Sequence, residues 1–116
     1  MLKNLYKFCS ENNMECLYFP LEDTEFFNRY SDGVPIYNQN KYILNKYSFV
    51  FFDGPHTTVL VKNEFDFFYN KIPSGGIIVF DDIDQYPHMK NLDTYIREKD
   101  FEILEKGICK ISYIKL

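Results

Sequence analysis

The chain has 116 residues, the size of one domain with a hydrophobic core of its own. Hydrophobic residues make up 46% of it and aromatic residues 19%, a composition that excludes a disordered chain. The formal net charge of -4 gives no electrostatic basis for holding a phosphate backbone, so we expect no nucleic acid partner.

The cysteines and the apolar segments indicate in which cellular compartment the chain is expected. Cys9, Cys16 and Cys109 are odd in number and form no Cys-x-x-Cys pair, so we expect reduced thiols, not disulfides or a thiolate zinc site. The amino terminus has no apolar stretch of signal-peptide length, and no segment approaches the roughly 20 apolar residues that span a bilayer. We therefore expect a single cytoplasmic domain over residues 1–116, without a membrane partner.

A helix is predicted at the start of the chain by four residues at helical spacing, Leu2, Leu5, Tyr6 and Cys9. Residues 14–20 are short, apolar and closed by a proline, which predicts a strand. Residues 21–24 can cap a second short helix that runs to Arg29.

Turn-forming residues dominate 31–46, where Gly33, Pro35 and several Asn and Gln residues from Asn38 onward occur. This composition predicts a long loop, with a short extended piece around residues 36–37. Residues 47–52 form a continuous apolar run that stops at an Asp-Gly-Pro turn, the pattern of a central strand buried on both faces.

A helix of about four turns is predicted from Thr57 or Thr58, as N-cap, to Ile72, because apolar residues recur along it at helical spacing. Residues 73–76 end this helix, and residues 77–80 predict a second buried strand. A strand, a helix and a strand in this order make a right-handed crossover, so we expect the two strands to be parallel.

The last part of the chain predicts a helix around residues 89–96 and then two strands. Residues 101–105 and 108–114 are strand-like on either side of Lys106-Gly107, which predicts an antiparallel hairpin. Together the elements predict an α/β fold.

Acidic residues follow both apolar strands, Asp53 after the first and the pair Asp81 and Asp82 after the second. In open α/β sheets ligands bind outside the carboxyl ends of the strands. Three carboxylates on one rim favour a hard divalent cation, and His56 in the same loop could add a ligand or a base. The alternative is that these aspartates only cap strand ends and helix N-termini.

The block Phe49 to Asp84, FVFFDGPHTTVLVKNEFDFFYNKIPSGGIIVFDDID, resembles the fourth strand, the following helix and the fifth strand of class I S-adenosylmethionine-dependent methyltransferases. It is closest in pattern to members with an Asp-Gly-x-His turn and a Gly-Gly-x-x-x-x-Asp-Asp strand. The trailing helix and hairpin are similar to the last helix and strands six and seven of that family. The resemblance implies a Rossmann-like three-layer sandwich with the sheet order 3-2-1-4-5-7-6.

The resemblance also implies chemistry for single residues. Asp53, Asp81 and Asp82 match the positions where metal-dependent members hold Mg²⁺ or another divalent cation that orients a substrate hydroxyl. His56 matches the histidine near the transferred methyl, and it or Asp53 would act as the catalytic base. The implied partner is a small-molecule methyl acceptor, which the sequence does not identify.

The resemblance implies that Glu22 and Asp23, near the adenine, and Asp53 bind the cofactor. The Gly-x-Gly loop and the acidic residue of strand two, which hold S-adenosylmethionine in this family, have no counterpart upstream of Met14. We therefore expect an incomplete domain that is inactive as an isolated chain. We also expect the edge at 47–52 to be covered by residues 14–20, by a second copy of the chain or by further upstream sequence.

Two other functions stay open. Asp82-Ile83-Asp84 is an Asp-x-Asp triplet of the kind by which many glycosyltransferases bind the metal of a nucleotide sugar. A non-catalytic interaction module would also account for the absent cofactor half and the apolar edge.

Overall fold

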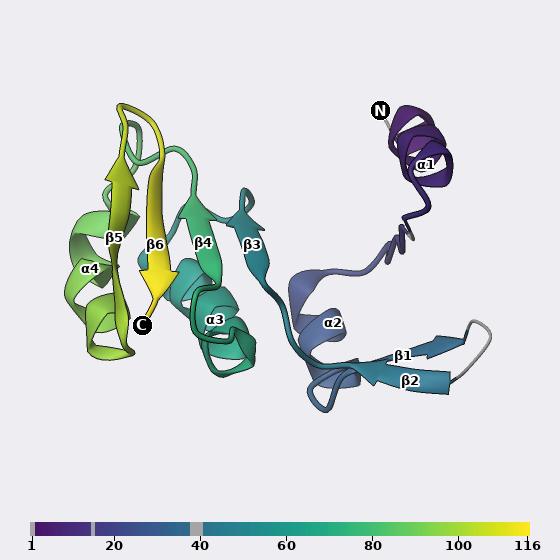
Figure 1. Ribbon diagram of the computed structural model, residues 1–116. Helices are drawn as coiled ribbons and strands as arrows, with labels where there is room; N and C mark the ends of the chain where they lie inside the picture. Colours follow the sequence, from purple (N-terminus) through teal and green to yellow (C-terminus); the bar gives the residue numbers. More distant parts are fainter. Residues whose placement is uncertain (1, 15, 38–40) are drawn as a thin grey trace.

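The computed structural model of the chain describes residues 2–14, 16–37 and 41–116. These residues form a four-stranded mixed sheet, a separate two-stranded hairpin and four α-helices (Figure 1). The helices are α1 (Leu2–Glu11), α2 (Asp23–Arg29), α3 (Thr58–Phe68) and α4 (His88–Glu98), with a 3-10 turn, η1 (Tyr69–Lys71), after α3. The strands are β1 (Val34–Tyr37), β2 (Lys41–Leu44), β3 (Phe49–Phe52), β4 (Ile77–Phe80), β5 (Phe101–Lys106) and β6 (Ile111–Lys115).

The four-stranded sheet has the order β3-β4-β6-β5. β3 and β4 are parallel, which confirms the predicted crossover through α3. β6 runs antiparallel to both β4 and β5, so the predicted carboxyl-terminal hairpin is also confirmed. Its connection, residues 107–110, is longer than the two-residue turn that the sequence suggested.

The core lies between this sheet and the two helices α3 and α4, which cover the same face (Figure 1). α3 begins where the sequence predicted, because the Thr57 hydroxyl accepts a hydrogen bond from the Leu60 N–H at 3.3 Å. The largest fully buried side chains come from both layers: Tyr113, Phe65, Phe80, Phe101, Ile78 and Ile96.

The opposite face of the sheet has no helix on it within the described part of the chain. Side chains alternate along a strand, so Phe52 points into the core while Phe49 and Phe51 point away from it. These two side chains remain 59% and 44% exposed, and β3 is the edge strand. The prediction that 47–52 is a central strand buried on both faces is therefore wrong, and the expected third layer is not among the described residues.

Two predictions for the first half of the chain need correction. The described residues of 14–20 form no strand; instead Phe19 packs its ring against Phe26 and Tyr30 at centroid distances of 5.2 Å. Aromatic packing on α2 therefore replaces the expected strand pairing. The predicted loop 31–46 contains the antiparallel pair β1 and β2, and residues 38–40 between them lie outside the described residues. Pro35 is tolerated because a two-stranded ribbon has only edge strands.

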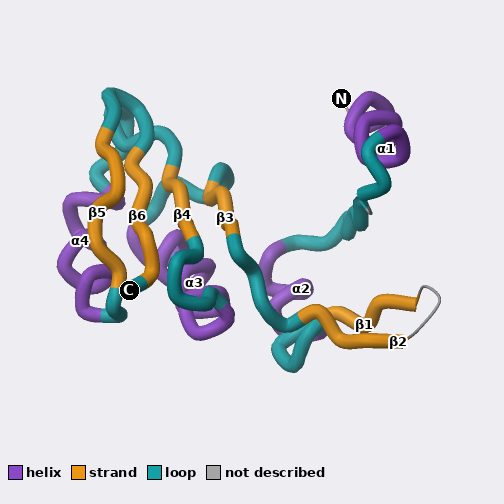
Figure 2. The backbone as a smooth tube through the Cα atoms, in the orientation of Figure 1, coloured by secondary structure: helices purple, strands orange, loops and turns teal. Residues whose placement is uncertain are grey.

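α1 lies apart from the four-stranded sheet, and a loop joins it to α2 (Figure 2). It confirms the predicted amino-terminal helix. Across the described ranges, none of the helices combines the length and the apolar character needed to cross a membrane.

Candidate functional site

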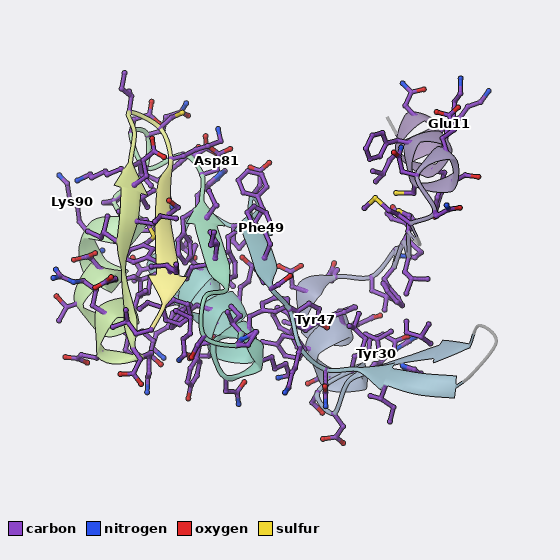
Figure 3. All side chains as sticks on the ribbon, viewed as in Figure 1. Glu11, Tyr30, Tyr47, Phe49, Asp81 and Lys90 are labelled. Carbon is purple, nitrogen blue, oxygen red and sulfur yellow. The ribbon has the colours of Figure 1, made fainter. Side chains whose placement is uncertain are left out.

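The three predicted aspartates meet at one end of the sheet. The register pairs Phe52 with Phe80, the last residues of the parallel neighbours β3 and β4, so the next residues, Asp53 and Asp81, leave the sheet side by side. One carboxylate oxygen from each of Asp53, Asp81 and Asp82 lies within 4.8 Å of the others. This confirms the predicted common rim, and Figure 3 shows Asp81 at the end of β4.

The backbone turns sharply at the second aspartate of the pair. Asp82 has φ 59°, in the left-handed region that favours glycine and costs other residues free energy. Its N–H donates a hydrogen bond to Oδ1 of Asp81 at 2.9 Å. Strained backbone of this kind collects at functional sites, and here it turns two successive carboxylates toward the same rim.

A lysine from the β5–β6 connection neutralises part of the cluster. Lys110 Nζ lies 3.0 Å from Oδ1 of Asp81. Its hydrogen bond, followed by that of the Asp82 N–H, holds the pKa of Asp81 below its usual range. Since both donors use Oδ1, the other carboxylate oxygen of Asp81 has no partner among these contacts.

His56 contacts the same cluster from the loop after β3. Its Nε2 lies 3.1 Å from Oδ2 of Asp82, and its ring stacks on Tyr86 with 4.0 Å between centroids and 4° between planes. An ionised carboxylate only accepts hydrogen bonds, so Nε2 carries the proton in this pair. Nδ1 is then the ring nitrogen of a neutral His56 that can take up a proton.

The sequence did not single out His88, the first residue of α4. Its side chain is 2% exposed, and burial lowers its pKa against the opposing effect of a hydrogen bond with the Asp81 backbone. By strict hydrogen-bond geometry its Nδ1 has no partner. It lines a cavity of about 10 Å³ together with His56 and all three aspartates. His88 comes into this site only through the packing of α4 on the sheet, and no local sequence pattern marks it.

The residues that were expected to bind the cofactor lie in the walls of two clefts between α2 and α3, and the second of these also borders β3. Glu22, Asp23 and Glu64 share a cleft of about 340 Å³, and Asp23, Asp53 and Glu64 share another of about 410 Å³. The structure therefore brings Asp23 and Asp53 to one cleft, whose walls include Phe26 and Phe68.

Glu64 on α3 was also missed from the sequence. Its Oε1 is buried without a hydrogen-bond partner. Burial first, and then the hydrogen bond and charge of Asp23, raise the pKa of Glu64 to about 8. A carboxyl group of α3 is therefore protonated at neutral pH beside a carboxylate of α2.

The Asp-x-Asp triplet is divided by the fold. Asp82 belongs to the described carboxylate cluster, whereas Asp84 is exposed and does not. No model of a known protein family matches the sequence, and a search of curated proteins finds no match. The chemistry of the site therefore has to follow from its geometry.

Proposed function

We propose that the chain is the cation-binding half of a domain similar to class I S-adenosylmethionine-dependent methyltransferases, acting on a small hydroxyl compound. The observation that supports this most is the order β3-β4-β6-β5, with two parallel strands followed by an antiparallel hairpin. If β3 and β4 correspond to strands four and five of that family, this order is 4-5-7-6, as the resemblance implies. The acidic rim then lies at the matching strand ends.

The donor set of the rim fits a divalent cation. Asp53, Asp81 and Asp82 offer carboxylate oxygens, the ligands that Mg²⁺, Ca²⁺ and Mn²⁺ prefer. Lys110 contacts Oδ1 of Asp81, and His56 contacts Oδ2 of Asp82. A cation bound here would lower the pKa of a hydroxyl group that approaches it.

His56 is the residue suited to take the proton of that hydroxyl. Asp82 fixes its Nε2 and Tyr86 supports the face of its ring, so Nδ1 keeps the free lone pair. A base oriented by a carboxylate is the usual arrangement for proton abstraction in enzymes.

S-adenosylmethionine does not fit the described residues alone. Within the part of the chain that the structure describes, no further strand pairs with the free side of β3, and the sequence contains no Gly-x-Gly loop that could approach the donor. We therefore derive no methyl-transfer step for these residues. The proposal assigns the donor site to a protein segment that pairs with β3 and adjoins the cleft of Asp23 and Asp53.

Calorimetric titration of the purified chain tests the proposal in three arms. MgCl₂ or MnCl₂ should bind to the wild type and fail to bind to Asp82→Asn, while the matched control Asp84→Asn should bind normally. S-adenosylmethionine should give no micromolar binding with or without the cation. Micromolar donor binding would contradict the incomplete donor site, and cation-dependent binding of uridine diphosphate glucose would favour the glycosyltransferase instead.

The exposed phenylalanines favour one second candidate, the interaction module. Phe49 and Phe51 lie on β3, which is an edge strand among the described residues, and Figure 3 shows Phe49 on this strand. The unpaired backbone groups of an edge strand are suited to pairing with another strand. Sedimentation equilibrium of the wild type and of Phe51→Glu separates the two functions. A dimer that dissociates in Phe51→Glu but binds no cation would support the module over the enzyme.

A further inference from the structure

The open face of the four-stranded sheet carries two defined rows of side chains. Residues paired across a sheet project from the same face, so the strand registers give the members of each row. From β3 to β5 the first row is Phe49, Ile77, Ile114 and Glu102, and the second row is Phe51, Val79, Ser112 and Glu105. The open face is therefore mainly apolar over β3, β4 and β6 and acidic at β5.

A second exposed apolar surface lies on α1, where Leu5, Tyr6 and Phe8 are exposed. α1 lies apart from the sheet (Figure 2), and Figure 3 shows Glu11 of α1 away from Phe49 of β3. A helix of 10 residues is marginal in water by itself, because most helical stability in proteins comes from packing an apolar side on another element. α1 therefore needs a surface on which its apolar side can pack.

The polar and apolar residues of α1 follow the same order as those of the open face. Residues three or four apart are neighbours on a helix, so Lys3 and Lys7 form one stripe that adjoins Tyr6, and Leu5 adjoins Phe8. Around α1 the order is therefore the two lysines, Tyr6, Leu5 and Phe8. Across the open face the order is the glutamates of β5, the mainly apolar residues of β6 and β4, and the phenylalanines of β3.

The charges of the two surfaces are complementary. α1 carries Lys3 and Lys7 and one acidic residue, Glu11, in a chain whose net charge is -4. Lys7 lies 4.0 Å from Glu11, but both side chains are exposed, and such a pair contributes little to stability. Glu102 and Glu105 are also exposed. Opposite charges at the edge of an apolar contact fix the orientation of the two partners.

We propose that α1 of a second copy of the chain covers the open face, in a twofold dimer that exchanges the two helices. Phe19 packs on Phe26 of α2, and α2 packs on α3 through the stacked rings of Phe27 and Phe67, 4.4 Å apart. The chain is thus anchored on the helix-covered side of its sheet, and the loop before Phe19 leads α1 away from that sheet (Figure 2). A twofold dimer buries both apolar surfaces in both copies. The dimer does not depend on the cation site.

Sedimentation equilibrium tests the dimer with a matched pair of α1 variants. Tyr6→Glu and Asn4→Glu add the same charge, but residues two apart lie on opposite sides of a helix. We expect a wild-type dimer whose Kd rises at least about tenfold in Tyr6→Glu and in Phe51→Glu and changes by less than about threefold in Asn4→Glu. A monomeric wild type would overturn the proposal. A dimer that dissociates in Phe51→Glu but not in Tyr6→Glu would overturn it too, because the two sheets would then pack on each other.

Carbodiimide cross-linking of the wild type identifies what covers the open face. The reagent joins a lysine amine to a carboxylate that it contacts, and equal amounts of ¹⁴N- and ¹⁵N-labelled chains are first unfolded and refolded together. Mass spectrometry should find Lys3 or Lys7 linked to Glu102 or Glu105, with one labelled and one unlabelled peptide in many of the links. Links within one isotope only would show that α1 packs on its own sheet and would overturn the exchange. Absence of links between these lysines and glutamates would also contradict the proposal.

Discussion

Replacing Glu64 by Gln should stabilise the chain at neutral and alkaline pH but not at acid pH. In the folded state the pKa of Glu64 is raised from 4.5 to about 8 by burial and by Asp23. Below pH 4.5 the carboxyl is protonated in both the folded and the unfolded chain, and its pKa difference has no effect on stability. As the pH rises from 4.5 to about 8 the unfolded chain loses this proton first, so the wild type becomes less stable.

The full pKa difference would amount to about 5 kcal/mol of the free energy of unfolding, at roughly 1.4 kcal/mol per pH unit. Glu64 is only partly buried, so solvent screening reduces this, and we expect about 2 kcal/mol. Gln keeps the shape of the side chain and can donate a hydrogen bond to Asp23, without an ionisation to oppose folding.

Urea unfolding at pH 4, 7 and 9, followed by circular dichroism, measures the effect. The difference between Glu64→Gln and the wild type should grow with pH and level off above about pH 8. The matched control Glu98→Gln, an exposed residue of α4, should follow the wild type at every pH. Parallel pH profiles for Glu64→Gln and the wild type would refute the reasoning.

Three further substitutions have defined outcomes. Phe65→Ala removes a ring with 0% exposure from the core and should lower the free energy of unfolding by about 3–5 kcal/mol in urea, while a loss below 1 kcal/mol would contradict the packing. Thr57→Ala deletes the cap of α3 and should cost about 1 kcal/mol, whereas Thr57→Ser should cost much less. Lys110→Ala should raise the pKa of Asp81 and tighten Mn²⁺ binding in calorimetry, because the Lys110 ammonium lies 3.0 Å from Oδ1 of Asp81 and repels a cation bound there. Weaker Mn²⁺ binding by Lys110→Ala would contradict this reasoning.

The unit from β3 to β4 could be predicted because its signals are local. The apolar runs 47–52 and 77–80, the cap at Thr57 and the helical stripe between them each depend on residues close in sequence. The parallel crossover rule then placed Asp53 and Asp81 at one rim, as the structure has them.

The missed features depend on tertiary packing. Apolar character in 14–20 predicted a strand, but Phe19 buries its ring against α2 and no strand pairs with the segment. Continuous apolar residues in β3 predicted burial on both faces, although helices cover one face only. His88 and Glu64 come into their sites through the packing of α4 and α3, which a local pattern does not reveal.

The most direct test of the cation site is a crystal structure of the chain grown with MnCl₂, with data collected for the anomalous signal of manganese. We predict one anomalous peak at the rim, within about 2.0–2.6 Å of oxygens from Asp53, Asp81 and Asp82. A rim without a peak, in which Lys110 and His56 alone neutralise the carboxylates, would contradict the account.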